Sequence, residues 1–258
     1  MNDLLNPRRF WWLLKFEYNQ KGQSLLFSAG IIVGLMLLLM LPILGSSTYL
    51  DILSLLHLLA FFVAVIMGGS LFTNLSFLEY GSPLKGIAAV MIPASRTEKF
   101  LLALLINLIF AATFILLYWK LHHWLIDLAN QNLSPESRWY QYTPPHVTVF
   151  LSYCYFLLQA VIFLGSIYFA KNSFVKTMGV FFVFGLVIYF FHFILVNSFS
   201  ENATNIMTFP FTSWQIWKGK NYFIDLPQEL EWVKWTILLS FILGLWYVAF
   251  VRLKEKEI

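Results

Sequence analysis

Six long stretches that almost lack charge constrain this chain more than any other feature of its sequence. They cover residues 24–44, 52–75, 100–119, 147–170, 177–197 and 233–251, and Lys234 is the only Asp, Glu, Lys or Arg within them. A helix needs about 20 apolar residues to cross the hydrocarbon core of a membrane, whereas the strands of membrane barrels alternate in polarity over about 10 residues. Because a helix bonds its backbone internally, the sequence predicts an all-α polytopic membrane protein with six transmembrane helices.

The composition agrees with this prediction and excludes other classes of protein. The chain is 59% hydrophobic and 12% charged, whereas about 25% of the residues in a soluble domain are charged. A soluble enzyme and a disordered chain are therefore excluded, and we expect a single membrane domain over residues 1–258. The first 23 residues include charged side chains, so the first span is expected to be a retained anchor rather than a signal peptide. The lone Cys154 excludes an intramolecular disulfide and a cysteine-based metal site.

The distribution of Lys and Arg predicts on which side of the membrane the termini lie. An even number of spans places both termini on one side. Twelve cationic residues flank the spans on that side, namely Arg8, Arg9, Lys15, Lys21, Lys85, Arg96, Lys99, Lys171, Lys176, Arg252, Lys254 and Lys256. Five lie on the other side, namely Lys120, Arg138, Lys218, Lys220 and Lys234. Because cytoplasmic segments carry the excess of Lys and Arg, we expect both termini in the cytoplasm. The sequence has no clustered run of Lys and Arg of the kind that would suggest a nucleic-acid partner.

The segment before the first span has the pattern of an interfacial helix. Residues 7–21 combine an aromatic and apolar face with four cations, and Pro7 suits a first helical turn. The alternative is a frayed tail. Glycines within the spans then suggest close helix contacts: Gly30 and Gly34 are four residues apart, and Gly68 and Gly69 are adjacent. These glycines predict packing either within the bundle or at a dimer seam, and the sequence favours neither.

The loop at residues 78–95 is the most informative segment on the predicted cytoplasmic side. A break at residues 81–83 precedes about two potential helical turns at 84–91, and Pro93 ends them. Ser95 and Glu98 then match a capping box, which predicts that the third long helix begins at Arg96. A short helix held between two span ends is well placed to transmit motion from a partner. The alternative is an ordinary connection.

The loops on the other side are longer and differ from each other. The start of the loop at 120–146 is expected to extend the third helix. The loop at 198–232 holds eight aromatic residues, namely Phe199, Phe209, Phe211, Trp214, Trp217, Tyr222, Phe223 and Trp232. Aromatic side chains favour the level of the lipid headgroups. We therefore predict a re-entrant outer hairpin before the last span, made of helical pieces that dip into the outer leaflet.

The sequence offers little chemistry for a catalytic, cofactor or metal site, and we predict none. Gly81 and Gly86 have the spacing of a phosphate loop, but Ile87 stands where lysine is required. None of the histidines, which are His57, His122, His123, His146 and His192, lies three or four residues from another. His57 and His192 lie within spans, where hydrogen-bonded packing is favoured over a proton relay. Asn74 could bond across helices. Ion-coupled carriers need buried charges, which the spans lack.

These features together resemble the permease subunits of type-2 ATP-binding-cassette (ABC) transporters over essentially the whole chain. That family has an interfacial helix, six spans, a coupling helix after the second span and a re-entrant hairpin before the sixth. These correspond here to residues 7–20, the six stretches, 84–91 and 198–232. Residues 92–100, read as Ile-Pro-Ala-Ser-Arg-Thr-Glu-Lys-Phe, also resemble a Pro-Ala-Ser-x-x-Glu-Lys stretch of one bacterial branch.

The resemblance implies an exporter-type transport subunit of the bacterial cytoplasmic (inner) membrane, which is not itself an enzyme. Two permease chains, identical or different, would form a pathway for an amphipathic or lipid-like substrate. Because this chain has no nucleotide-binding domain, ATP and Mg²⁺ would bind separate cytoplasmic ATPase subunits. The residues implied in coupling to the ATPase are Glu79, Leu84, Lys85, Pro93, Ser95, Glu98 and Lys99. The alternatives are an ATP-independent carrier or channel, a membrane scaffold subunit, and a membrane enzyme that uses His122 and His123.

Overall fold

The computed structural model describes residues 5–77, 91–169, 171–199, 205–207, 214–217, 220–224 and 227–256. The predicted coupling helix at 84–91 therefore lies outside the described residues except for Met91. Glu79, Leu84 and Lys85 also lie outside them.

The helices and strands follow one another in a simple order. The helices are α1 (Pro7–Met40), η1 (Leu41–Gly45), α2 (Asp51–Ala60), η2 (Phe61–Gly68), α3 (Gly69–Leu75), α5 (Arg96–Asn132), α6 (Pro145–Tyr168), α7 (Ser173–Phe199), η4 (Gln228–Leu230) and α8 (Glu231–Lys256). The strands are β1 (Asn205–Met207), β2 (Trp214–Trp217) and β3 (Asn221–Ile224).

Six helical segments in the described part of the chain are long and apolar enough to cross a membrane. Each corresponds to one of the six predicted stretches, which confirms a multi-pass helical membrane protein. The second segment runs through α2, η2 and α3 without interruption, and η2 is a π-helical section. The third continues to Asn132, as the sequence predicted.

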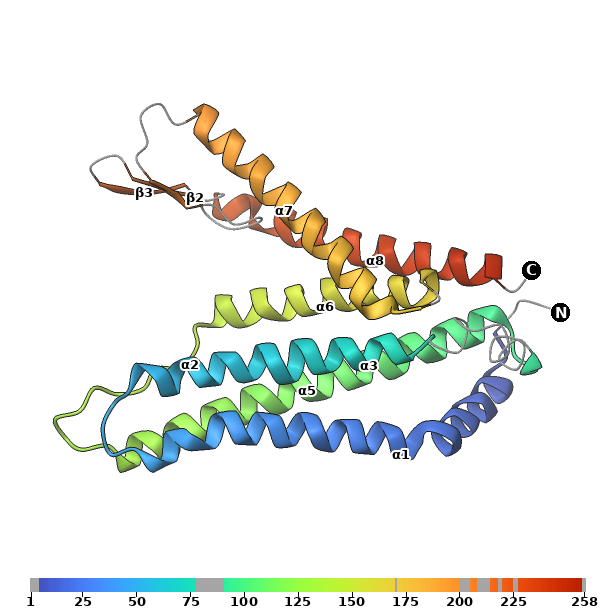
Figure 1. Ribbon diagram of the computed structural model, residues 1–258, viewed down its shortest axis with the longest axis horizontal. Helices are drawn as coiled ribbons and strands as arrows, with labels where there is room; N and C mark the ends of the chain where they lie inside the picture. The colour runs from blue at the N-terminus through green and yellow to red at the C-terminus, as the bar shows by residue number, and fades with distance from the viewer. Residues whose placement is uncertain are drawn as a thin grey trace.

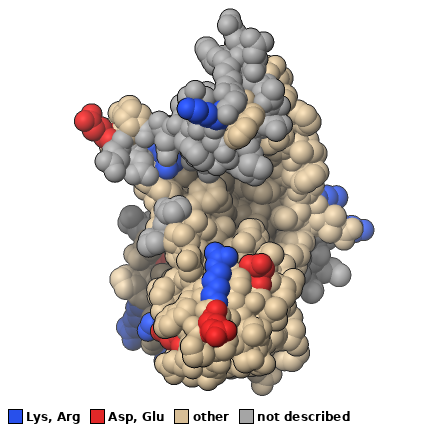
Figure 2. Space-filling model, turned by 90° about the vertical axis from the view of Figure 1, so that its left-hand side faces the viewer, with Lys and Arg blue, Asp and Glu red and all other residues tan. Residues whose placement is uncertain are grey.

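The long helices lie side by side as an elongated bundle (Figure 1). The start of α1 and the end of α8 lie at the same end of the bundle, which we call the termini end. The connections at 46–50 and 133–144 lie at the opposite end (Figure 1). A view onto this opposite end shows scattered charges of both signs among uncharged residues (Figure 2).

The core lies between α1, the second span, α5 and α6. Its largest buried side chains include Met36, Phe61, Tyr118 and Tyr155. A second cluster near the termini end joins the end of the second span to α5, α6 and α8, and consists of Phe77, Phe100, Phe163, Ile167, Ala249 and Leu253. These two clusters make five of the spans one packed unit.

Helix α7 differs from the other spans because, apart from the buried Val196 near its end, its buried residues lie near its start. Ser173 and Thr177 are buried there, and the helix then diverges from the bundle (Figure 1). Its large apolar side chains further along are exposed, including Val180, Phe182, Val187, Phe190 and Ile194. Lipid or a partner chain has to cover these residues, since so apolar a surface is unfavourable in water.

The sequence left open whether the span glycines pack within the bundle or at a dimer seam, and the structure distinguishes two groups of them. A Cβ at Gly68 would approach the Ile32 side chain to 2.8 Å, and one at Gly69 would collide with the Tyr155 side chain. These two glycines therefore pack within the bundle. Around Gly30 and Gly34, by contrast, no described atom lies within 4 Å of an added Cβ.

The helix that the sequence predicted over residues 7–21 does not end before the first span. The helix is present, but it continues into the first span as the single helix α1. Figure 1 shows a bend rather than a break near its N-terminal part. The physical reason is that only Gly22 interrupts the pattern there, and a lone glycine weakens a helix by about 1 kcal/mol without ending it.

The predicted helical pieces of the loop at 198–232 are wrong for its described central residues. These form a three-stranded antiparallel sheet in the order β1-β2-β3. The segments Trp214–Trp217 and Asn221–Ile224 are rich in aromatic residues and isoleucine, which favour strands. Aromatic density alone therefore does not distinguish a strand from a helix at a membrane surface.

The close contact between α6 and α7 yields a test of the packing. We expect Gly165→Ala to lower the free energy of unfolding by about 2 kcal/mol, because its Cβ would collide with Thr177. Thr177 cannot easily move, since its hydroxyl donates to the Ser173 carbonyl at 2.6 Å. Gly244→Ala, where no described atom lies within 4 Å of an added Cβ, is the control and should be neutral or slightly stabilising. Reversible unfolding in detergent measures both, and equal effects would contradict this packing.

Candidate functional site

The start of α5 has the cap that the sequence predicted. Ser95 Oγ accepts a hydrogen bond from the backbone N of Glu98 at 3.2 Å, and Glu98 Oε2 accepts one from the backbone N of Ser95 at 2.8 Å. Met91 is the last helical residue before the irregular segment that contains Pro93. The cap thus fixes where the connection ends and the third span begins.

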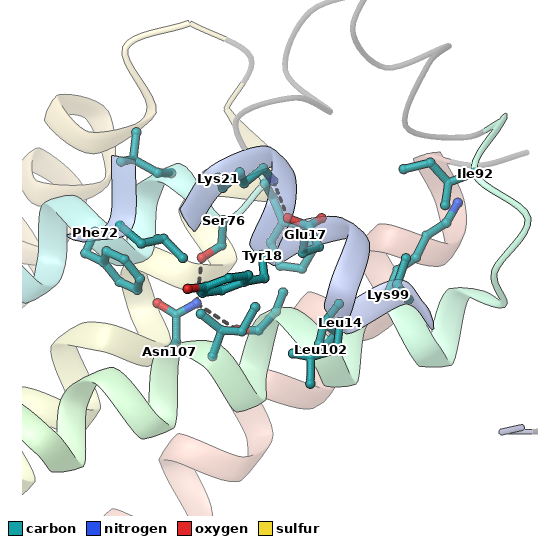
Figure 3. Close-up of a pocket in the computed structure, with 16 residues that line it drawn as sticks. Leu14, Glu17, Tyr18, Lys21, Phe72, Ser76, Ile92, Lys99, Leu102 and Asn107 are labelled. Carbon is teal, nitrogen blue, oxygen red and sulfur yellow. Dashed lines mark hydrogen bonds and ion pairs between the residues drawn. The ribbon is translucent and has the colours of Figure 1, made fainter. Parts of the chain in front are cut away.

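A pocket of about 160 Å³ lies between α1, the end of α3 and the start of α5 (Figure 3). Asn107 forms part of its wall and is buried. The side-chain amide of Asn107 donates to Ser76 Oγ at 2.5 Å and to the Ala103 carbonyl at 2.8 Å. These bonds link the end of the second span to the third span beside the pocket.

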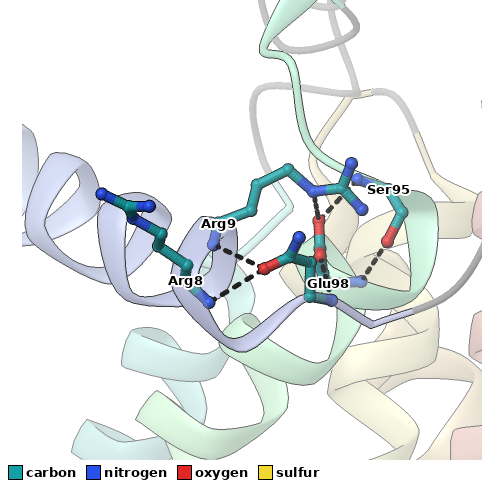
Figure 4. A network of polar contacts seen from close by, with 5 residues as sticks. Arg8, Arg9, Ser95 and Glu98 are labelled. Atoms are coloured by element: carbon teal, nitrogen blue, oxygen red, sulfur yellow. Dashed lines mark hydrogen bonds and ion pairs between the residues drawn. The ribbon is translucent and has the colours of Figure 1, made fainter.

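The carboxylate of Glu98 connects the start of α5 to the start of α1. Glu98 is fully buried, and its Oε1 accepts a hydrogen bond from the backbone N of Asn6 at 2.9 Å. Its Oε2 accepts from Arg9 Nε at 2.6 Å and from the backbone of Ser95 (Figure 4). We call these four residues the Glu98 network. Three donors, one of them charged, offset the desolvation of a carboxylate that would otherwise be very unfavourable.

Apolar contacts reinforce this junction between α1 and α5. Leu13, Ala94 and Leu102 form a small buried cluster, against which Phe10 and Ile92 also pack. The N-cap of α1 contributes as well, since Asn6 Oδ1 accepts from the backbone N of Arg8 at 3.0 Å. The first turns of α1 are therefore attached to the segment immediately before the third span.

Neutral polar contacts join the other spans, as the sequence suggested for Asn74. Ser173 Oγ at the start of α7 donates to Asn74 Oδ1 at the end of α3, with a distance of 2.6 Å. This confirms a hydrogen bond across helices. Gln159 on α6 is fully buried, and no described group bonds its side-chain amide.

His57 and His122 meet inside the bundle, which the sequence did not indicate. His57 Nε2 lies 3.1 Å from the Met40 carbonyl, an acceptor, so this nitrogen carries the hydrogen. His122 Nε2 lies 3.2 Å from the backbone N of Thr143, a donor, so its hydrogen is on Nδ1. The two Nδ1 atoms are 3.1 Å apart, and His122 therefore donates to His57. Two neutral rings satisfy each other in this arrangement.

This pairing bears on the metal alternative. Each of the four ring nitrogens already takes part in a hydrogen bond, so none has a lone pair left for a metal. His123, the neighbouring candidate, is exposed, and its Nδ1 lies 2.7 Å from the Trp119 carbonyl. Within the described ranges, no group of three or more metal-ligating side chains converges. His57 thus has the hydrogen-bonded packing role that the sequence favoured.

Tyr142, which lies outside the spans, forms a hydrogen bond with a carboxylate near His123. The phenol of Tyr142 donates to Asp127 Oδ1, and this hydrogen bond raises the pKa of Tyr142 above its ordinary value. The Tyr142 ring also stacks on His123, with centroids 4.9 Å apart. The loop at 133–144 is thereby held against α5.

The structure brings together only some of the predicted coupling residues. Pro93, Ser95, Glu98 and Lys99 lie at the termini end, where Ser95, Glu98 and Lys99 are buried. Sequence reasoning missed the partners of Glu98, which are Asn6 and Arg9. No local pattern could have indicated this pairing, because Arg9 and Glu98 are 89 residues apart. The only sequence signal was the Asn6-Pro7 pair, which is typical of a helix start.

No known protein family, curated protein or solved structure matches this chain.

The Glu98 network predicts different effects for two adjacent arginines. We expect Arg9→Met to lower the midpoint of thermal unfolding by about 5 °C, because it removes the cation that faces a buried carboxylate. Arg8→Met is the matched control and should change the midpoint little, since the Arg8 side chain is exposed and points away from Glu98 (Figure 4). Scanning fluorimetry of the purified protein compares them. Equal midpoints would show that the network does not stabilise the fold.

Proposed function

We propose that this chain is the membrane-spanning permease subunit of a type-2 ABC transporter in the bacterial cytoplasmic membrane. It moves an amphipathic or lipid-like substrate, and a separate cytoplasmic ATPase binds ATP and Mg²⁺ and supplies the energy. The observation that carries the proposal is the Glu98 network, because it attaches two spans to the segment at 78–95. The six apolar helices and the resemblance of residues 92–100 support the same proposal.

The proposed mechanism follows from the connections at the termini end. The ATPase binds the segment at 78–95, which lies between the end of α3 and the cap of α5. Displacement of this segment acts on α5 through the Ser95–Glu98 cap and on α1 through the bonds from Glu98 to Asn6 and Arg9. One movement of the partner therefore reaches two spans together. These residues transmit motion and are not catalytic.

The distribution of buried charge supports an external source of energy. Among the described residues, the buried charged side chains are Glu98 and Lys99, and both lie at the termini end. Carriers driven by ion gradients place ionisable groups within the spans, where they bind or release the ion. The spans of this chain hold neutral pairs such as Asn74–Ser173 instead. A partner that hydrolyses ATP fits this interior better than an ion gradient does.

The unpacked helix surfaces support a second permease chain as a further partner. Gly30 and Gly34 on α1 have no described neighbour within 4 Å of an added Cβ, and most of α7 is exposed. Small residues four apart let helices of two chains approach closely. We therefore assign this part of α1 to the contact between permeases, whether the second chain is identical or different.

Co-purification with an ATPase is the decisive test of the proposed function. The tagged chain, extracted from its native host in mild detergent, should retain an ATP-hydrolysing subunit. We expect Glu79→Lys to reduce the recovered ATPase about tenfold, because the change reverses the charge of the proposed binding segment. Glu136→Lys, an exposed position at the opposite end, should leave the recovery unchanged. Recovery of no ATPase with the unaltered chain would refute the proposal.

The proposed orientation can be tested on intact cells. Cys154→Ala removes the only thiol, and single cysteines are then introduced by Ser134→Cys or Lys254→Cys. Both positions are exposed and lie at opposite ends of the bundle. We expect a membrane-impermeant maleimide to label Ser134→Cys and to reach Lys254→Cys only after the cells are opened. The reverse pattern would place the termini outside.

A further inference from the structure

A second cavity, with a volume of about 480 Å³, lies between α5, α6 and α8. Cavities of about 300–1,000 Å³ are usual for small-molecule sites. Ile115 and Ile242 on its walls are buried, whereas Val149 and Leu239 are nearly half exposed, so the cavity opens onto the side of the bundle. None of the described residues that line it is charged. We call this cavity the α6 groove, and its walls suit an uncharged ligand.

Two hydrogen-bond donors on the walls of the α6 groove have no acceptor. Nε1 of Trp119 on α5 and Nε1 of Trp246 on α8 are buried, and no described group accepts a hydrogen bond from either atom. An indole N–H can only donate, and a buried donor without an acceptor is unfavourable. The Ser152 hydroxyl on α6, by contrast, already donates to the Thr148 carbonyl at 2.9 Å. A ligand that fits these walls therefore carries an acceptor, such as a carbonyl or ether oxygen.

The side chains at one end of the α6 groove indicate its depth in the membrane. Tyr153 lines the groove, and its ring packs against that of Trp235 with the centroids 4.5 Å apart. The Lys234 ammonium lies 4.9 Å from the Trp235 ring centroid, and tryptophan with lysine is typical of the headgroup level. Trp246 follows Trp235 by about three turns of α8, or about 16 Å. Because the hydrocarbon core is about 30 Å thick, the groove extends from the headgroups of the leaflet opposite the termini end to the middle of the bilayer.

We propose that the α6 groove binds a neutral, lipid-like molecule that carries a carbonyl or ether oxygen and enters from the leaflet opposite the termini end. Its hydrocarbon body lies against the apolar walls, and its oxygen accepts a hydrogen bond from the indole of Trp119 or Trp246. Both indole nitrogens are covered by protein atoms in the structure, so these rings turn toward the groove when the ligand binds. A charged group is disfavoured inside the groove because no described lining residue offers a counter-charge.

This proposal rests on the chain lying in a bilayer and not on the transport activity, so its test uses the purified full-length chain without any ATPase. A diazirine analogue of methyl oleate is photo-crosslinked to the protein in detergent, and mass spectrometry identifies the labelled residues. We expect the labels within 148–156 and 239–246. Methyl oleate, oleate and octadecene, which have chains of the same length, then compete with the probe. Methyl oleate should compete at about fivefold lower concentration than octadecene, which lacks an acceptor, or oleate, which is charged.

A matched pair of serine variants locates the binding. Ser152→Phe fills the α6 groove from α6 and should abolish labelling there. Ser240→Phe is the control, because Ser240 is exposed on α8 and does not line the groove. Both serines donate to the backbone carbonyl four residues earlier, at 2.9 Å and 2.8 Å, so the two changes remove equivalent hydrogen bonds.

Tryptophan variants test the two donors and keep the experiment valid even if Ser152→Phe fails to fold. Trp119→Phe and Trp246→Phe each retain an aromatic ring and remove the N–H. The double variant should compete equally with methyl oleate and octadecene, because the acceptor then has no donor to bond. Trp124→Phe, at an exposed position on α5 outside the groove, should keep the fivefold difference. This ratio compares two ligands on one variant, so a change in stability alone does not alter it.

Several outcomes would overturn the proposal. Labels spread evenly over the exposed faces of the spans would show contact with lipid but no site. Equal competition by methyl oleate and octadecene on the unaltered chain would leave the acceptor without a role, and stronger competition by oleate would contradict a neutral ligand. An unchanged ratio in the double tryptophan variant would exclude the indole donors. Failure to co-purify an ATPase would leave all these measurements unaffected, so the two proposals fail separately.

Discussion

The structure depends on the requirement that a polar group removed from water must find its partners within the protein. Glu98 illustrates this best, because its carboxylate is fully buried and still accepts bonds from Asn6, Arg9 and Ser95. Those donors come from the start of α1 and the start of α5. A buried carboxylate without these donors would be strongly unfavourable. The charge of Glu98 on α5 therefore fixes the position of the start of α1.

The same requirement explains why the interior is polar without being charged. His57 and His122 satisfy each other as neutral rings, and Asn74 bonds Ser173 across two spans. Neutral pairs of this kind hold helices together in a membrane with little desolvation. A bundle built in this way has few ionisable groups with which to couple to an ion gradient, which connects its architecture with the proposed dependence on an ATPase.

Much of the fold could be predicted, and the errors have physical causes. The six spans and the capping box follow from hydropathy and from side-chain chemistry within a few residues of each other. The helix predicted at 7–21 is present but continues into the first span, because Gly22 is too weak a breaker to end α1. The helical hairpin was wrong because short aromatic segments suit both interfacial helices and strands, and here strand pairing satisfies the backbone. At the candidate site, Ser95 and Glu98 were predictable, whereas Arg9 was not.

The sequence by itself determined that the chain is a multi-pass helical membrane protein, that its third span begins after the Ser95 cap, and that its spans lack charge. These properties depend on the order of residues along one helix. The tertiary structure decided which residues meet: Arg9 with Glu98, His57 with His122, and Gly69 with Tyr155, while Gly30 and Gly34 remained open. Such pairs depend on which helices become neighbours and on how these helices are shifted relative to each other along their axes. No local pattern encodes this, because the partners of each pair lie 65 to 89 residues apart in the sequence.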